Sequence, residues 1–405
     1  MEIKPEIETF AKIKVVGIGG GGGAAINRMV NVGISGIEFL AVNTDAQALH
    51  HSEADNKIHI GKNTTRGLGA GMDPDLGRKS AEENLDEIHD HLKGSDMVFI
   101  TCGLGGGTGT GAAPVIADVA RDVGSLTVAI ITKPFTFEGE QRRAIAESGY
   151  RELADRVDAI ITIPNDRLLQ IIDKKTTLLE AFTVADDILR QGVQGISNLI
   201  TVPGLINVDF ADVKAIMANT GSALMGIGHG TGENRSIDAA KSAIDSPLLD
   251  LSINGARGIL FTITGGPDLG MYEVNEAAKI ITESADPNAR VIFGAIIDDA
   301  MKDDVSITVV ATGFDADKGG RPVRTPHREE TRRTVHPEPR PLLVDDTRPA
   351  PESSFAPKGF SLNEEPVMPA SPRESRPRTI DTPKTSRDEN DEDLEIPAFI
   401  RKKMM

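Results

Sequence analysis

The sequence predicts an α/β fold built on a parallel, doubly wound sheet. Short apolar runs alternate with segments of helical spacing five times between residues 12 and 163, which is the pattern of strands joined by crossover helices. Two of the apolar runs end in dense glycine turns, at Gly19–Gly23 and Gly103–Gly111. Such turns at the carboxyl ends of strands are typical of open sheets that bind ligands along that edge.

The length and composition indicate two globular domains followed by a tail. The 405 residues exceed what one core usually holds, and the hydrophobic content of 39% is ample for a core. The expected organisation is a flexible N-terminus at 1–11, a first domain at 12–176, a central helix at 177–203, a second, smaller α/β domain at 204–314, a disordered linker at 315–390 and a terminal peptide at 391–405.

Charge and cysteine usage exclude several classes of partner. The net charge is −17, and the tail from Ala316 to Asp388 is nearly balanced, so the excess lies on the folded body, which would repel nucleic acid and anionic membrane. The single cysteine, Cys102, rules out an internal disulfide and is expected to be a small buried residue. With no apolar leader and no segment of membrane-spanning length, we expect a cytoplasmic protein.

The first domain follows a regular order. Strands are expected at 12–19, 37–42, 97–100, 126–132 and 159–163, and helices at 24–32, from about 75 to 92, at 112–120 and at 141–154. The amphipathic stretch from Thr177 to Leu199 reads as a long helix. Beyond it we expect helices at 210–217 and 272–285 and strands at 258–264, 291–297 and 306–311.

The tail differs sharply in composition. Thirteen of the 23 prolines lie between Arg321 and Lys384, without any hydrophobic period, so this segment is predicted to be disordered. The last residues regain a pattern of apolar side chains at the end of this tether, which indicates a docking peptide. A tail without such a function would also fit the pattern. The residues expected to contact a partner are Leu394, Ile396, Pro397, Phe399, Ile400 and Arg401.

The Gly103–Gly111 turn has six glycines in nine residues and is interpreted as a phosphate cradle. A flexible linker is the simplest alternative, but a buried strand and a helix bracket the turn. A Walker loop is excluded because no Lys-Ser or Lys-Thr follows the last glycine. A dinucleotide turn matches poorly, since it has sparser glycines in the first strand-to-helix unit. Two dense glycine turns favour a nucleoside triphosphate.

Several carboxylates and histidines have competing interpretations. Asp186 and Asp187 have the pattern of a solvated helix face. Asp209 and Asp212 have the spacing of a helix N-cap and a first-turn acid. Asp45 resembles the ribose-binding acid of a dinucleotide enzyme, which is one alternative function. The histidines lack partners that would complete a metal site, so no protein-held metal is expected.

The sequence resembles FtsZ, the tubulin-like GTPase family of bacterial cell division. The matching motifs lie in order along residues 13–314, and one further motif lies in the tail peptide. They are Gly19–Gly23, Asn43–Leu49, Gly103–Gly111, Pro134–Gly139, Pro164–Asp166, Asn207–Val213 and Ile396–Arg401. One departure is Ala24, where many members have asparagine.

The resemblance implies a tubulin-like fold in which 12–176 binds GTP and GDP and 204–314 is the GTPase-activating domain. The residues implied in nucleotide binding are Gly20, Gly21, Gly22, Gly23, Ala24, Asn43, Asp45, Gly71, Gly103, Gly106, Gly107, Thr108, Gly109, Glu138, Arg142, Asn165, Phe182 and Asp186. Asp186, placed beside the base by the resemblance, would accept the N1 and N2 hydrogens of guanine, which selects GTP over ATP. Mg²⁺ would be held by the GTP phosphates.

The resemblance also implies a head-to-tail filament with a split active site. Asp209 and Asp212 of one subunit would act on the GTP of the next subunit, and the filaments would form a ring at the division site beneath the inner membrane. The tail peptide would bind membrane-tethering and regulatory division proteins, without direct membrane insertion. A tubulin-like scaffold that binds GTP without hydrolysing it is the second alternative, and Asp209 and Asp212 argue against it.

Overall fold

The structure, a computed structural model, describes residues 11–314 except 171, 173, 174, 203, 247–252 and 254. The predicted linker and terminal peptide lie outside the described residues. One sheet of ten strands runs through the described part in the order β3-β2-β1-β4-β5-β6-β7-β10-β8-β9. The strands are β1 (Ile13–Ile18), β2 (Ile37–Asn43), β3 (Asn56–His59), β4 (Met97–Gly103), β5 (Leu126–Lys133), β6 (Ala159–Pro164), β7 (Gly221–Thr231), β8 (Gly258–Gly265), β9 (Arg290–Ile297) and β10 (Asp304–Thr312).

The sheet is parallel from β3 through β7, as the sequence predicts for its first half. Only β10 runs antiparallel, to both of its neighbours β7 and β8, while β8 and β9 are again parallel. Because β1 to β6 are parallel, the turns that follow β1, β2, β4, β5 and β6 all lie at one edge of the sheet.

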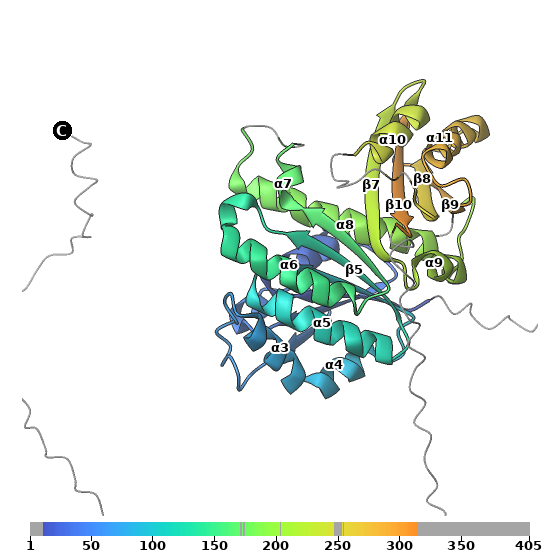
Figure 1. Ribbon diagram of the computed structural model, residues 1–405. Coiled ribbons are helices and arrows are strands. Elements are labelled where there is room, and N and C mark those ends of the chain that lie inside the picture. The colour runs from blue at the N-terminus through green and yellow to red at the C-terminus, as the bar shows by residue number, and fades with distance from the viewer. Residues whose placement is uncertain are drawn as a thin grey trace, which may run out of the picture. The chain divides into compact units, whose positions relative to one another are not determined.

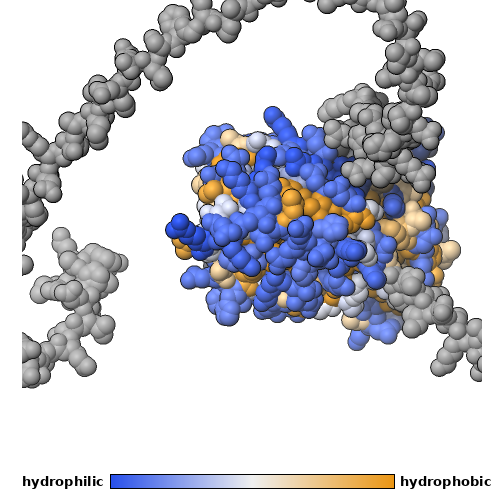
Figure 2. Space-filling model, turned by 90° about the horizontal axis from the view of Figure 1, so that it is seen from below, coloured by the Kyte–Doolittle hydropathy of each residue, from blue (hydrophilic) through white to orange (hydrophobic). Residues whose placement is uncertain are grey.

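Helices cover both faces of the sheet (Figure 1). One apolar core joins α1, α8 and α9 to one face, and a second core joins α3, α4, α5 and α6 to the other. The helices are α1 (Gly19–Val32), α2 (Ala46–His50), α3 (Pro74–Glu83), α4 (Leu85–Leu92), α5 (Gly107–Asp122), α6 (Glu140–Ala154), α7 (Asn165–Leu168), α8 (Leu178–Thr201), α9 (Phe210–Met217), α10 (Arg235–Ile244) and α11 (Met271–Glu283), with a 3-10 turn η1 (Thr136–Glu138). The face seen from below is mainly hydrophilic, with hydrophobic residues gathered near its centre (Figure 2).

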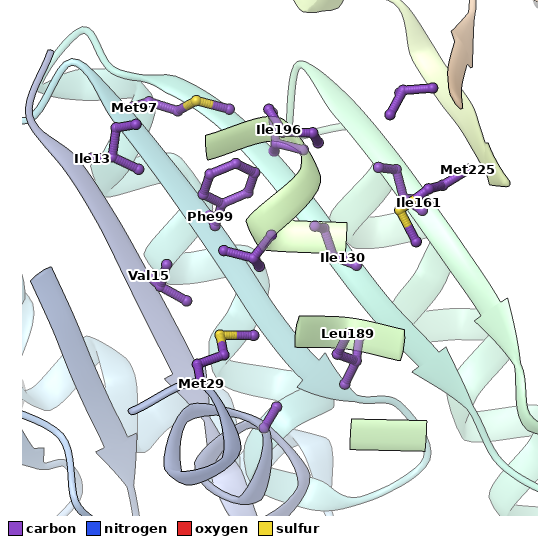
Figure 3. Close-up of a cluster of buried hydrophobic side chains, with 14 of the residues drawn as sticks. Ile13, Val15, Met29, Met97, Phe99, Ile130, Ile161, Leu189, Ile196 and Met225 are labelled. Atoms are coloured by element: carbon purple, nitrogen blue, oxygen red, sulfur yellow. The ribbon is translucent and has the colours of Figure 1, made fainter. Parts of the chain in front are cut away.

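The two faces of the sheet alternate residue by residue. Val15 packs on the α1 and α8 side while Val16 packs on the α5 side, as the period of two in a strand requires. Figure 3 shows the first core, in which Met29 of α1 and Leu189 and Ile196 of α8 meet strand residues such as Phe99. Cys102 is fully buried, as expected, and burial raises the pKa of its thiol to about 12, so it is not a reactive thiol at neutral pH.

Several predicted boundaries were wrong, and each has a local cause. The helix expected from about 75 to 92 is two helices, because Asn84 leaves the helix and accepts a hydrogen bond from the Gly61 N–H, 3.0 Å away. The expected helices at 24–32 and 112–120 begin earlier, at Gly19 and Gly107, so both glycine turns are largely the first turns of helices.

Two elements of the second half escaped prediction, β7 and α10. In β7 the glycines at 226, 228 and 230 alternate with larger residues and weaken the strand signal. They lie directly under α10, where a Cβ at Gly226 or Gly228 would collide with the carbonyl oxygens of Ala243 or Ala239. The glycines therefore let the helix pack closely on the strand.

Candidate functional site

The predicted phosphate turns lie together at the carboxyl edge of the parallel strands. Gly107, the first residue of α5, donates its N–H to the carbonyl of Gly71 over 2.7 Å. A Cβ on Gly21 of α1 would stand 3.3 Å from the nitrogen of Gly103, at the end of β4. The structure thus brings together three segments far apart in sequence, around the amino ends of two helices. Helix amino ends attract anions such as phosphate.

The glycines of this edge fall into two groups. A Cβ on Gly22 would collide with the Thr101 carbonyl, one on Gly107 would lie 2.7 Å from the Ala70 oxygen, and one on Gly109 would lie 2.8 Å from the Gly103 oxygen. Close packing of the chain explains these three without a ligand. A role of their backbone N–H groups in the predicted phosphate cradle stays a prediction.

The second group of glycines has no such explanation. A Cβ on Gly20, Gly23, Gly106 or Gly71 would meet no atom within 4 Å. Only Gly71 needs to be glycine for its backbone, at φ 57°. Packing does not account for the missing side chains at the other three positions, and open space beside exposed helix N–H groups is what a bound phosphate group needs.

Ala24 lines a cavity of about 200 Å³ together with Gly20 and Gly23. The cavity lies between α1, the end of β2 and α2, and its polar lining comes from Asn27, Asn43 and Ser52. The open glycines are therefore next to a real hollow, and alanine at position 24 leaves that hollow wide.

The side chains of Asn43 and Asp45 both accept hydrogen bonds from nearby backbone N–H groups. Asp45 is the N-cap of α2, where its Oδ1 accepts hydrogen bonds from the N–H groups of Gln47 (2.8 Å) and Ala48 (3.2 Å). The side chain of Asn43 is buried, and its Oδ1 accepts from the Asp45 N–H. Capping explains the presence of Asp45, which was the main support for the alternative of a dinucleotide enzyme. A role of Asn43 and Asp45 in nucleotide binding stays a prediction.

Thr44, directly after β2, lies between the predicted residues Asn43 and Asp45 but was not itself predicted. Its hydroxyl lies 2.6 Å from the hydroxyl of Thr108 in the first turn of α5, and both side chains are buried. Its carbonyl accepts from Gly69 N–H and from the Thr65 hydroxyl. The Asn43–Leu49 motif contains this residue, but no periodicity or spacing signals its pairing with Thr108, which joins two segments 64 positions apart.

Glu138 and Arg142 form an ion pair across one turn at the end of β5. The other carboxylate oxygen of Glu138 accepts from the Phe135 N–H at 2.9 Å. The Nε of Arg142 is buried without a hydrogen-bond partner among the described residues. A buried, unsatisfied donor of this kind is costly, so it fits a site that an anionic ligand completes.

The three predicted base-binding residues, Asn165, Phe182 and Asp186, lie on α7 and α8. Asn165 opens α7 and is buried, and its Oδ1 has no partner among the described residues. Phe182 of α8 is 41% exposed and meets the ring of Phe135 edge to face at 5.7 Å. A buried amide oxygen without a partner on α7 and a partly exposed aromatic ring on α8 are the groups that a planar base would use.

Asp186 and Asp187 differ although they are neighbours on α8. Asp187 accepts hydrogen bonds from Arg190 and Gln191, which hold the pKa of its carboxyl low despite partial burial. Burial raises the pKa of Asp186 to about 6, an effect that Arg28 opposes. A partly desolvated carboxylate of this kind gains more than Asp187 from accepting the guanine N–H groups.

Asp209 and Asp212 lie far from the other site residues of the same chain. Asp209 caps α9, accepting from the Asp212 N–H at 2.8 Å, and both residues are exposed. The segment after α9 is bonded to the amino end of β6, where Asn219 donates to Asp158. Asn165 lies at the other end of β6, about 20 Å away along a six-residue strand. Figure 1 shows α9 and α7 at opposite ends of the strands.

The described residues contain no group of three histidine, cysteine, aspartate or glutamate side chains placed to hold a metal ion. Within the same part of the chain, every helix is too short or too polar to span a membrane. The predicted docking residues Leu394, Ile396, Pro397, Phe399, Ile400 and Arg401 lie outside the described residues.

Comparisons with known proteins agree with this geometry. Residues 12–173 match the family model described as Tubulin/FtsZ family, GTPase domain, and residues 221–315 match FtsZ family, C-terminal domain. An FtsZ dimer from M. jannaschii is 47% identical, with a TM-score of 0.73 over 76% of this chain and 90% of that chain. CetZ2 from Haloferax volcanii, solved as a GTPγS-bound protofilament, is 21% identical, with a TM-score of 0.64 over 74% of this chain and 92% of that chain, and so shares the fold.

Proposed function

Because the chain belongs to the FtsZ family of tubulin-like GTPases, we propose that it polymerises head to tail and hydrolyses GTP at the interface between subunits. In this proposal Asp209 and Asp212 of one subunit act on the GTP held at the carboxyl edge of the next subunit. The observation that carries it is the placement of the two aspartates toward the amino ends of the parallel strands, whereas the open glycines and Asn165 lie at the carboxyl ends.

Within one subunit the chain supplies a binding site for the whole nucleotide. Gly20, Gly23, Gly106 and Gly71 leave room for the phosphates, and the amino ends of α1 and α5 provide their N–H donors and positive dipole ends. The unpaired Arg142 Nε and Asn165 Oδ1 would gain partners on binding. Mg²⁺, held by the phosphates, would neutralise charge that develops during phosphoryl transfer.

The exposed apolar residues fit such an assembly. Leu68, Phe137 and Leu179 are 85%, 63% and 78% exposed on segments around the carboxyl edge. Leu205, four residues before Asp209, is 78% exposed on the opposite side. Apolar side chains on two opposite sides are what a head-to-tail contact requires, since such an interface joins two different surfaces.

We infer that the filaments form a ring at the division site and that Leu394–Arg401 docks to membrane-tethering partners. The apolar spacing of that peptide and the acidic net charge of the chain support this role. Deleting residues 394–403 is expected to leave GTP-dependent sedimentation intact and to abolish recruitment to the division site in cells. Loss of sedimentation after this deletion would contradict the assignment.

The decisive test of interface hydrolysis is the GTPase rate as a function of protein concentration, with Mg²⁺. A split site predicts almost no turnover below a threshold concentration and a linear rise above it. A rate proportional to concentration from the start would mean that each subunit carries a complete site. GTP bound without turnover at any concentration would support the non-hydrolysing scaffold instead.

A further inference from the structure

We propose that Thr44 is a positioning residue for GTP binding and hydrolysis, acting through the hydroxyl of Thr108; the inference rests on the proposed function. Thr44 sits directly after β2, and Thr108 belongs to the first turn of α5. Their hydroxyl oxygens are 2.6 Å apart, so one of them donates a hydrogen bond to the other. The direction of that bond decides what Thr108 offers to a ligand.

Burial distinguishes the two directions. Thr44 is 0% exposed, and within the described part of the chain its hydroxyl has no partner besides Thr108. If Thr108 donated, the Thr44 hydrogen would be buried without an acceptor, which costs free energy. If Thr44 donates, its own hydrogen is paired and only the hydrogen of Thr108 is left without an acceptor in the pair. Thr108 is 9% exposed at the amino end of α5, where an anion would sit.

The bond therefore directs the Thr108 hydrogen toward the ligand. With Thr44 as donor, one lone pair of Thr108 is occupied and its O–H is free to bond a phosphate oxygen. Thr44 does not reach the ligand itself, because its side chain is fully buried behind Thr108. Its effect on the reaction passes through the hydroxyl of Thr108.

The main chain of Thr44 extends this role to the neighbouring loop. Its carbonyl accepts from the Gly69 N–H at 3.3 Å and from the Thr65 hydroxyl at 3.2 Å. The same loop carries Gly71, whose carbonyl receives the Gly107 N–H. Thr44 is thus bonded through its side-chain oxygen to α5 and through its carbonyl oxygen to the loop that carries Gly71. These bonds fix the position of α5 relative to that loop.

The test compares Thr44→Val with Thr44→Ser. Valine keeps the shape but cannot donate, so GTP affinity and kcat/KM are each expected to fall about tenfold, the effect of one lost hydrogen bond. Serine keeps the hydroxyl and should stay within about twofold of the native protein. Thr127→Val is the matched control, because Thr127 is also fully buried but lies at the other end of its strand; its GTPase rate should be unchanged.

A double-mutant cycle separates positioning from a general structural effect. In a Thr108→Ala background there is no hydroxyl left to orient, so Thr44→Val should cost less than about twofold more. An equal loss in both backgrounds, or Thr44→Val with native affinity and turnover, would overturn the inference. If the native protein itself fails to hydrolyse GTP, the proposed function fails, whereas direct GTP binding by each variant still tests Thr44.

Discussion

Asp209 accepts a hydrogen bond from the backbone N–H of Asp212, with 2.8 Å between nitrogen and Oδ1. This bond satisfies one of the free donors at the start of α9 and accounts for the spacing of the two aspartates by helix chemistry alone. It leaves the Asp212 carboxylate and the second oxygen of Asp209 facing solvent. A capping role and a role in the neighbouring subunit are therefore compatible, and they can be measured separately.

Asparagine and alanine at these positions distinguish capping from catalysis. Asp209→Asn keeps the capping oxygen, so the free energy of unfolding should be nearly unchanged, whereas Asp209→Ala should lose about 1 kcal/mol. If the carboxylates orient the attacking water, Asp209→Asn and Asp212→Asn should each lower GTP turnover about 100-fold or more. Denaturant unfolding and phosphate release measure the two effects. Native turnover in both asparagine variants would leave capping as the only role.

Mixing two inactive variants tests whether the site is shared. Asp212→Asn should bind GTP but fail to act on a neighbour, and Asn165→Leu should lose GTP binding but keep intact aspartates. In a mixture, some interfaces pair the nucleotide of the first variant with the Asp212 of the second. If the site is shared, the mixture should hydrolyse GTP faster than the sum of the two variants measured alone. A rate equal to that sum would contradict a shared site.

The raised pKa of Asp186 predicts a pH dependence of guanine binding. Below about pH 6 the carboxyl is protonated and one acceptor for the guanine N–H groups is lost, so GTP affinity should fall as the pH drops from 7 to 5. Asp186→Asn should bind GTP more weakly at pH 7 and lack this dependence. The native preference for GTP over inosine triphosphate, which lacks the 2-amino group, should also shrink in the variant. Fluorescence competition at each pH gives both results, and an unchanged pH profile in Asp186→Asn would contradict the assignment.

The same carboxyl should reduce the stability of the nucleotide-free protein. Because burial raises its pKa in the folded state, the native protein binds a proton more readily than the unfolded chain between about pH 4 and 6. Stability linked to Asp186 is therefore lost as the pH rises through that window and stays lost above it. Asp186 is only partly buried, so Asp186→Asn should raise the free energy of unfolding at pH 7 by on the order of 1 kcal/mol. An equal or lower value would show that burial does not penalise this charge.

The two groups of glycines predict opposite outcomes of substitution by alanine. Gly111 also belongs to the packed group, because a Cβ there would collide with the Pro74 carbonyl, so Gly111→Ala should destabilise the fold by about 1–3 kcal/mol. At Gly20 and Gly106 the space is open, so Gly20→Ala and Gly106→Ala should fold with near-native stability and bind GTP at least tenfold more weakly. Thermal unfolding and nucleotide titration check the pair. Native GTP affinity in both open-site variants would mean that no phosphate occupies that space.

Much of the fold could be predicted because each element carries a local signal. The buried strands β4 and β5 are continuous apolar runs, and α8 has an apolar stripe that begins after the capping residue Thr177. Elements were missed where contacts with distant segments, rather than local propensity, determine the residue types. The glycines of β7 look like a broken strand, yet they are required by a helix that packs on them.

The candidate site was predicted as a set of residues rather than as a geometry. The glycine turns were predicted from their composition and position, and Asn165 and Asp186 from the family resemblance. The prediction did not include the hydrogen bond between Thr44 and Thr108, nor the packing that requires glycine at three of the predicted phosphate positions. A motif shows which residue types occur together. It does not show which glycines pack against neighbouring backbone and which lie beside open space.

By itself the sequence determined the alternation of strands and helices, the edge at which the turns gather and the residue types available there, because these follow from local periodicity and from parallel strands. Only the tertiary structure decided which glycines are open and which donors are unsatisfied. It alone placed Asp209 and Asp212 at the opposite end of the strands from Asn165. Those properties depend on contacts between segments distant in the chain, which local sequence does not encode.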